Sequence, residues 1–256
     1  MIKYNDLLDT LFKEWKNSYS EEDRKKFCED GIMLKYDKSI DVDEQWEKST
    51  RRIMFLLKDC PDGWGYDTRG MLIDEKKGEE NRTLKNKFTR NLAKILYGLQ
   101  NKERNEVHDK YVNEHMSDAE RIWNTVPFAF IETKKLAGGK DVSPETIKKA
   151  LTRDKLFLAK EIDILRPNII VCFDGDNNIF KYITDEYFMG VKPSIEKRYI
   201  YDNANFNCCL NYYEQNNTVV INSYHPSAVV DDWIFLEKVF SPFRSLLGDL
   251  PNDKRL

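Results

Sequence analysis

The chain has 256 residues, of which 41% are hydrophobic and 33% are charged, and its formal net charge is −3. This composition is typical of a globular protein with a charged surface, and the length allows one large domain or two small ones. No apolar run approaches the roughly 20 residues of a membrane helix, and the acidic, amphipathic start is unlike a signal peptide. The net charge gives no overall attraction for nucleic acid, so any DNA-binding surface has to be a local patch.

The first fifty residues carry helical patterns. Apolar side chains recur at helical spacing over residues 2–18, and Ser20 is a candidate N-cap for a second helix. We interpret residues 1–50 as a helical extension packed on a core domain that spans residues 51–256. We expect the protein to be a monomer.

A first buried strand is predicted around residues 52–58. Residues 53–57 form an uninterrupted apolar run, as expected for a strand that is buried on both faces. The next residues are dense in turn formers and combine carboxylates with aromatic rings, which suits a ligand pocket, although a surface loop with solvated acids is the alternative. The side chains in question are Asp59, Cys60, Pro61, Asp62, Trp64, Tyr66 and Asp67.

A helix over residues 83–99 follows, with Phe88 in its first turn, and residues 100–116 read as a loop or a solvated helix. Residues 122–131 form a strand-like apolar run that Asn124 interrupts, and we predict a strand over residues 126–131. A buried asparagine has to find hydrogen-bond partners, so Asn124 either satisfies neighbouring backbone or recognises a polar ligand edge. We expect residues 133–141 to be a flexible basic loop.

The second half of the chain alternates helices with strands. Ser143 and Pro144 start a helix over residues 143–165, a buried strand covers 169–173, and a short helix follows near 178–185. Residues 190–217 read as a hairpin or an excursion before a strand over 218–223 and a helix over 231–247. This order predicts an α/β protein, namely a three-layer α/β/α sandwich with a short, mostly parallel four-stranded sheet.

His225 comes directly after the last predicted strand. Pro226 cannot continue a central strand and restricts His225 to an extended conformation. The histidine would therefore be held at the carboxyl end of a strand, where open α/β sheets bind their ligands. A histidine that only caps the edge of the sheet is the alternative.

The cysteines indicate free thiols rather than a metal site. Five cysteines is an odd number, no CxxC occurs, and this usage predicts a reducing, cytoplasmic setting. The sequence also lacks a Walker loop, a GxGxxG motif and an HExxH motif, so we expect no metal and no cofactor.

Four segments, taken in order, resemble the motifs of the uracil-DNA glycosylase superfamily. Lys58-Asp59-Cys60-Pro61-Asp62 is similar to its first motif, in which Asp59 falls where a thermostable branch has a glutamate. Phe88, followed by Ile95 and Leu96, is similar to the aromatic residue that stacks on a flipped base. Asn124-Thr125-Val126-Pro127 resembles the motif whose asparagine recognises the pyrimidine edge, and His225-Pro226-Ser227 resembles the last motif.

The resemblance implies DNA as the partner and a role for each matching residue. Asp59 would orient water or stabilise the sugar cation, and His225 would stabilise the negative charge on the leaving base. An apolar side chain, Val229 or Val230, would fill the vacated stack. The implied substrate-binding residues are Asn124, Phe88, Pro61 and Tyr66. The implied DNA-binding residues are Ser227, Ala228, Val229, Lys85, Lys87 and Arg90, with Lys134 and Lys135 as further phosphate contacts.

The resulting hypothesis is a hydrolase that cleaves the N-glycosidic bond of uracil, or of a related damaged base, flipped out of DNA. A protein of the same fold that binds DNA or a nucleobase-like ligand without cleavage is the alternative, because Lys58 and Asp62 stand where the family has glycines. A third reading is a hydrolase of small nucleosides or similar ligands that uses Asp59, Asp67 and His225.

Overall fold

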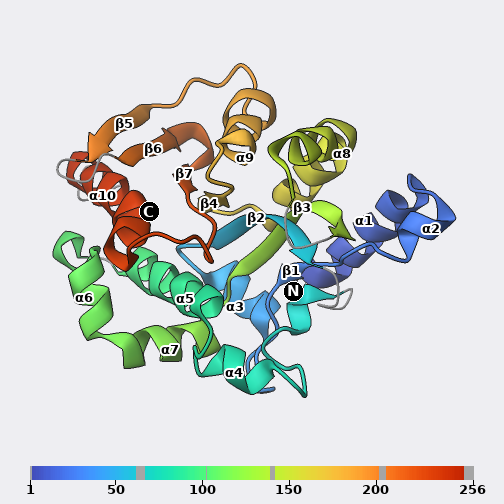
Figure 1. Ribbon diagram of the computed structural model, residues 1–256, viewed down its shortest axis with the longest axis horizontal. Helices are drawn as coiled ribbons and strands as arrows, with labels where there is room; N and C mark the ends of the chain where they lie inside the picture. The colour runs from blue at the N-terminus through green and yellow to red at the C-terminus, as the bar shows by residue number, and fades with distance from the viewer. Residues whose placement is uncertain (1, 62–66, 102, 139–141, 202–205, 251–256) are drawn as a thin grey trace.

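The computed structural model describes residues 2–61, 67–101, 103–138, 142–201 and 206–250, and among side chains it leaves out that of Pro61. The described strands form one seven-stranded mixed sheet with the order β1-β3-β2-β4-β7-β6-β5 (Figure 1). The strands are β1 (Gly31–Ile32), β2 (Ile53–Pro61), β3 (Ala129–Gly138), β4 (Ile169–Phe173), β5 (Ile195–Tyr201), β6 (Phe206–Tyr213) and β7 (Thr218–Ser223).

The centre of the sheet is parallel. Strand β2 pairs in parallel with β3 on one side and with β4 on the other, and β4 pairs in parallel with β7. The predicted core of four parallel strands is therefore confirmed. The predicted size of the sheet is wrong, since β1 adds to β3 and the β5–β6 hairpin adds to β7, all in antiparallel pairing. The hairpin lies in the segment 190–217, for which a hairpin was one of the two expectations.

Helices cover both faces of the sheet. Helices α5, α6, α7 and α10 lie on one face, and α1, α3, α8 and α9 lie on the other (Figure 1). None of the described helices is both long and apolar enough to cross a membrane. The α-helices are α1 (Tyr4–Asn17), α2 (Glu21–Arg24), α3 (Val42–Lys48), α4 (Gly78–Arg82), α5 (Lys87–Gln100), α6 (Asp109–Glu114), α7 (Met116–Thr125), α8 (Pro144–Leu165), α9 (Asn178–Lys181) and α10 (Asp232–Asp249).

Strand β2 shows why its sequence is apolar without interruption. Ile53, Phe55 and Leu57 point into the core beneath α5 and α10. Met54 and Leu56 point into the second core, beneath α1 and α8. Side chains alternate between the two faces of a strand, so a central strand between two helical layers has no face left for polar residues.

The structure corrects the sequence interpretation around β3. Residues 116–125 form helix α7, and the strand begins only at Ala129 and continues to Gly138. Trp123 belongs to the helix and stacks on Phe128, with ring centroids 4.4 Å apart, so the apolar run is a helix end packed on a strand start. The flexible loop expected from residue 133 is wrong as far as residue 138, where the strand includes the buried Thr133 and Lys135. Residues 139–141 lie outside the described residues.

The first fifty residues are integrated with the rest of the chain. Helix α1 packs on α8, where the Trp15 ring stacks on Phe157 with centroids 5.3 Å apart and its Nε1 donates to Asp154 Oδ1 at 3.2 Å. Strand β1 belongs to the sheet itself. The segment expected to be a helical extension therefore supplies an edge strand as well as helices.

Candidate functional site

The carboxyl ends of the four parallel strands meet at one edge of the sheet. Asp59 lies near the end of β2, Lys134 lies in β3, Asp174 follows β4, and His225 follows β7 by two residues. In open α/β sheets this edge is where ligands bind. The sequence-predicted residues Asp59 and His225 thus share one edge, at the ends of two different strands.

The loop after β7 fixes the tautomer of His225. The backbone N–H of Ser227 donates to Nδ1 of His225 at 3.2 Å. The backbone N–H of Ala228 donates to the His225 carbonyl at 2.8 Å, which closes a tight turn. A neutral imidazole that accepts at Nδ1 carries its proton on Nε2, so this ring is a hydrogen-bond donor at Nε2.

The surroundings of His225 keep it uncharged. Burial and then the nearby charge of Lys58 lower the pKa of His225 to about 4. At neutral pH the ring is therefore an uncharged donor and not an imidazolium. A neutral donor of this kind can stabilise negative charge that develops on a substrate without first being protonated.

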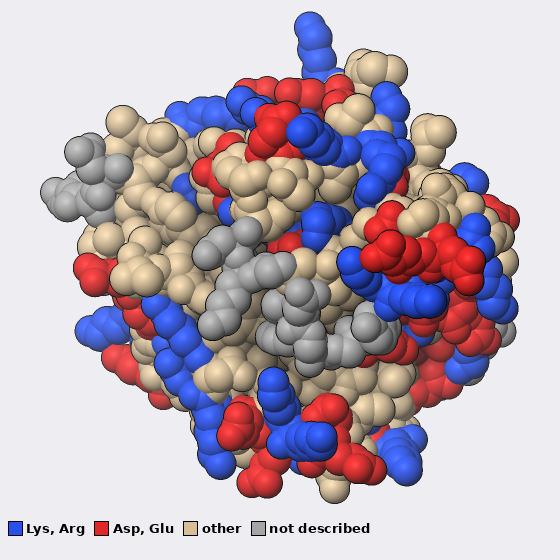
Figure 2. Space-filling view, turned by 45° about the vertical axis from the view of Figure 1, so that its right-hand side comes forward, with Lys and Arg blue, Asp and Glu red and all other residues tan. Residues whose placement is uncertain are grey.

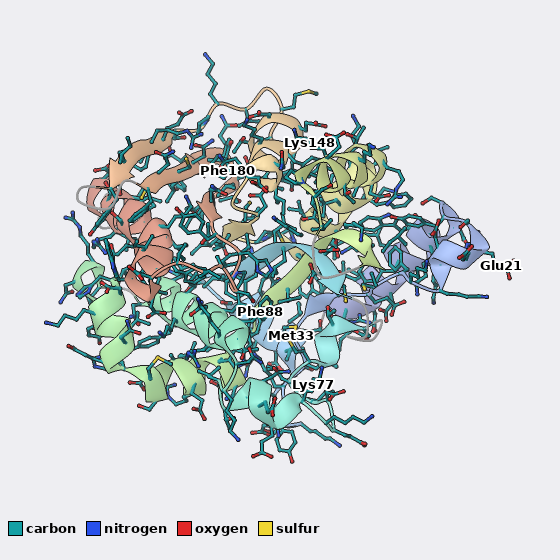
Figure 3. All side chains as sticks on the ribbon, in the orientation of Figure 1. Glu21, Met33, Lys77, Phe88, Lys148 and Phe180 are labelled. Carbon is teal, nitrogen blue, oxygen red and sulfur yellow. The ribbon has the colours of Figure 1, made fainter. Side chains whose placement is uncertain are left out.

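Helix α5 holds the His225 loop in place. Asn91 Nδ2 donates to the Pro226 carbonyl at 2.8 Å, and Lys87 Nζ donates to the Ala228 carbonyl at 2.7 Å. Phe88, in the first turn of the same helix, lies near the middle of the molecule (Figure 3). Its ring centroid is 5.8 Å from that of His225. The structure thus brings the predicted stacking ring and the predicted anion-stabilising histidine into contact.

Asp59 forms an ion pair at the neighbouring strand end. Its Oδ2 lies 3.2 Å from Lys134 Nζ, and the two side chains are 11% and 14% exposed. Lys58 points elsewhere and lies 3.5 Å from Asp176. A carboxylate whose oxygen already faces an ammonium group is better placed for charge stabilisation than for proton abstraction.

Sequence reasoning missed Glu132. This glutamate lies in β3, is 2% exposed, and follows four buried apolar residues, which are Phe128, Ala129, Phe130 and Ile131. A lone acid inside such a run was the available signal, because a carboxyl group is seldom buried without a specific reason.

Asn124 does not join this group. It lies in α7, before β3 begins, and therefore at the amino end of the strand and not at the edge with Asp59 and His225. Its Nδ2 donates to the carbonyls of Arg82 at 3.0 Å and Glu120 at 2.8 Å. Asn124 thus donates both amide hydrogens to backbone carbonyls. Of the two expectations for this residue, the structure shows the one in which it satisfies neighbouring backbone.

Replacing Asn124 by alanine is expected to destabilise the fold without affecting ligand recognition. The loss of the two hydrogen bonds, one of which joins α7 to α4, should lower the free energy of unfolding by about 1–2 kcal/mol. Chemical denaturation, together with an assay of base binding or release, tests this. Thr125→Ala, which removes an exposed hydroxyl on the same helix turn, is the matched control. An Asn124 variant with full stability and lost binding would contradict the placement.

The remaining predicted residues differ in exposure. Ser227 and Lys85 are exposed, and Ala228 and Arg90 are half-buried. Val229 is fully exposed at 100%, which suits an apolar wedge. Lys135 is buried, so its predicted contact with phosphate is wrong. Pro61 ends β2, where its backbone pairs with Gly138, and Tyr66 lies outside the described residues, as do Asp62 and Trp64.

Charges of both signs are mixed on the face shown in Figure 2. On the face in Figure 2, Lys and Arg side chains are interspersed with Asp and Glu over most of the area, and one row of basic side chains runs down its lower left part. This agrees with the net charge of −3. With this net charge, any attraction for DNA backbone has to come from local groups of cations.

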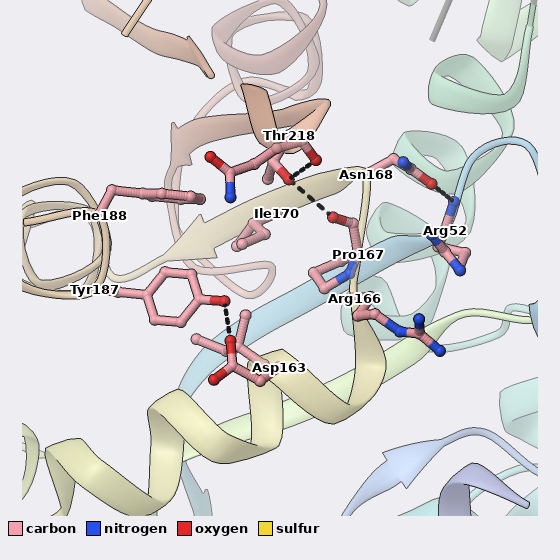
Figure 4. A pocket seen from close by; sticks show the side chains of 11 residues that line it. Arg52, Asp163, Arg166, Pro167, Asn168, Ile170, Tyr187, Phe188 and Thr218 are labelled. Atoms are coloured by element: carbon pink, nitrogen blue, oxygen red, sulfur yellow. Dashed lines mark hydrogen bonds between the residues drawn. The ribbon is translucent and has the colours of Figure 1, made fainter. Parts of the chain in front are cut away.

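Two hollows lie away from the histidine. A cavity of about 350 Å³ lies near the amino ends of β4 and β7, where Arg52 and Arg166 lie on one side and Tyr187 and Phe188 on the other (Figure 4). Its Tyr187 hydroxyl donates to Asp163 at 2.7 Å. A larger hollow of about 860 Å³ is lined by residues between 67 and 86. Neither hollow includes Asp59, Phe88 or His225, so the case for the strand edge rests on its chemistry and not on cavity size.

One cluster of described residues has metal-ligating types. His108, Asp109 and Glu237 place one possible ligand atom each within 4.8 Å of the others, between α6 and α10. The Glu237 carboxylate, however, is bound by Arg244 at 2.7 Å and accepts the Asp109 backbone N–H at 3.1 Å. The guanidinium group of Arg244 already binds the Glu237 carboxylate and would repel a metal ion. We therefore interpret the cluster as a contact between α6 and α10.

No protein-family model matches the chain, and no curated protein matches it.

Proposed function

We propose that the protein hydrolyses the N-glycosidic bond of uracil, or of a related damaged base, flipped out of DNA. The observation that carries the proposal is the contact between the Phe88 ring and the neutral His225 ring at 5.8 Å, at the strand edge that also holds Asp59. An aromatic face, an uncharged donor and a carboxylate are the groups that this reaction requires. The resemblance of the sequence to the uracil-DNA glycosylase superfamily supports the same reaction.

Each group has a defined task in the proposed reaction. Phe88 stacks on the extruded base and offsets part of its unstacking, which costs a few kcal/mol. His225 donates its Nε2 hydrogen to the oxygen on which negative charge develops as the base leaves. Asp59, held in an ion pair with Lys134, stabilises the positive charge that develops on the sugar and orients the attacking water.

The proposal is tested by incubating the full chain with labelled oligonucleotides. Uracil, hypoxanthine, xanthine and thymine are each placed in single strands and in duplexes, and release of the free base is followed under single-turnover conditions. Alkali-sensitive abasic sites that form with one of these bases support the proposal. Intact strands across the whole panel, at enzyme in excess over DNA, would overturn it.

Binding without cleavage is a second candidate function. The ion pair between Asp59 and Lys134 favours it, because a carboxylate with an ammonium partner is a poor base for activating water. In that case the same oligonucleotides bind and remain intact, and Lys134→Met does not create turnover. Turnover by the unmodified protein would eliminate this candidate.

The role of Val229 can be tested by comparing duplex with single-stranded DNA, which serves as the control. Its side chain is fully exposed, so Val229→Ala is expected to leave thermal stability unchanged. If Val229 fills the space left by an extruded base, the variant should lose activity on duplex DNA and retain it on single strands, which have no stack to fill. Paired duplex and single-strand rates measure this, and equal losses on both would contradict the wedge role.

A further inference from the structure

Glu132 lies on the same face of the sheet as the proposed base-binding residues. In β3, Phe130 and Glu132 are two residues apart and therefore point to the same face. Phe130 contacts the Phe88 ring, with centroids 6.0 Å apart, and Phe88 in turn contacts His225. Across the strand pair, Glu132 is in register with Leu57, two residues before Asp59. Glu132 thus lies between the aromatic pair and the Asp59–Lys134 ion pair.

One oxygen of the Glu132 carboxyl group is buried without a partner among the described residues. The side chain is 2% exposed, and its Oε2 makes no hydrogen bond in the described part of the chain. Lys134 binds Asp59, and the buried Lys135 binds Asp30 and Glu161. A buried polar atom without a partner costs roughly 1–3 kcal/mol, so its presence requires an explanation, and a bound ligand is one.

The charges around Glu132 favour its neutral form. Burial raises the pKa of Glu132 well above its usual range, and the negative charges of Asp30 and Asp59 raise it further. Cys28 acts in the same direction, and Lys135 opposes them. These influences favour the neutral carboxylic acid, which has one O–H donor and one C=O acceptor on a single planar group.

We infer that Glu132 recognises the polar edge of the bound base as a neutral carboxylic acid, an inference that rests on the function proposed above. A carboxylic acid pairs with a base edge that presents one donor beside one acceptor, whereas an ionised glutamate offers two acceptors and fits only an edge with two donors. His225 supplies a donor for a carbonyl oxygen of the same base. The ligand class is therefore a pyrimidine base, with its O2 toward His225 and its N3–C4 edge toward Glu132.

Two substitutions separate recognition from a structural role. Glu132→Gln keeps one donor and one acceptor at the same place but cannot ionise. Glu132→Ala removes both. The measurement is equilibrium binding of an oligonucleotide that carries a non-hydrolysable deoxyuridine analogue, repeated over a series of pH values because burial raises the pKa of Glu132. An oligonucleotide of normal bases at the same position provides the reference for nonspecific binding.

We expect the alanine variant to bind about tenfold or more weakly, as for the loss of a buried hydrogen-bonded pair, and the glutamine variant to bind nearly as well as the unmodified protein. Affinity of the unmodified protein should fall as pH rises, because Glu132 loses its donor when it ionises. The glutamine variant should show no such fall. A purely structural role would change the melting temperature of the variants but not the pH dependence of their affinity.

The outcomes distinguish this inference from the function on which it rests. If the unmodified protein shows no preference for the pyrimidine analogue at any pH, the proposed function fails, and the role of Glu132 fails with it. If the analogue binds but Glu132→Ala binds it equally well, only the role of Glu132 is overturned. The same holds if Glu132→Gln keeps the alkaline loss of affinity.

Discussion

Replacing His225 by alanine is expected to lower the rate of base release by a factor of about 100 or more, the usual cost of losing a donor that stabilises developing negative charge. The loss should appear in the single-turnover rate and only weakly in affinity for the oligonucleotide, since the charge exists mainly in the transition state. Phe88 remains in the alanine variant, so stacking of the base is retained. Single-turnover rates and equilibrium binding on the same substrate separate the two effects.

His225→Gln is the control for this prediction, because its amide can donate from a position close to Nε2 and should restore part of the rate. The pH profile provides a second check. With a pKa of about 4, His225 is neutral across the physiological range, so its own titration should leave the rate unchanged between about pH 6 and pH 8. A catalytic imidazolium would instead lose activity as pH rises through its ordinary pKa. A profile of that second kind that persists in the Glu132→Gln variant would contradict the neutral-donor role.

The parallel core of the fold was predictable because each of its strands contains a short, uninterrupted apolar run. The run at residues 169–173 is buried at every position, and so is β7. The edges were not predictable in the same way. Strand β1 has only two residues, and β5 alternates half-buried with exposed side chains. Strand β1 depends on β3, a partner far along the chain, and the alternating pattern of β5 does not by itself show that the β5–β6 hairpin joins the sheet through β7.

The candidate site was predictable where its geometry depends only on residues that are neighbours in the sequence. Pro226 and the strand before it are enough to place His225 at the edge of the sheet. Asn124 was misplaced because a helix end followed by a strand start produces the same apolar run as one long strand. Glu132 was overlooked because its burial depends on the fold, and a glutamate in sequence reads as a surface residue.

Lys135→Met is expected to cost about 3–5 kcal/mol of stability, the typical loss when one member of a buried ion pair is removed. Lys135 is fully buried, and its Nζ lies 2.6 Å from Asp30 and 2.9 Å from Glu161. Burial disfavours its charge, but Asp30 and Glu161 outweigh burial and raise the pKa of Lys135. Without the ammonium group, two buried carboxyl groups are left without the cation that holds them together.

Chemical denaturation of Lys135→Met and of a neutralised triple variant tests this account. In the triple variant, Asp30→Asn and Glu161→Gln accompany Lys135→Met. The Asp30→Asn change keeps a side-chain oxygen to accept the Glu132 backbone N–H, which Asp30 accepts at 2.7 Å. The triple variant should recover most of the lost stability, since neutral groups of similar volume are tolerated where an unpaired charge is not. Equal losses in both variants would show that packing, and not charge, holds this region.

The cost of Lys135→Met should also depend on pH. Burial and the negative charge of Asp30 raise the pKa of Glu161, and Lys135 opposes them. Without the ammonium group, the protonated form of Glu161 is favoured further in the folded state, whereas the unfolded chain keeps an ordinary carboxyl group. Folding then binds protons, so the stability of the variant is greatest below the unfolded carboxyl pKa and falls as pH rises. The gap to the unmodified protein should therefore widen from about pH 4 to pH 8. Asp30 also accepts the Glu132 backbone N–H, so the same group of charges links the first fifty residues to the strand that carries the proposed recognition group.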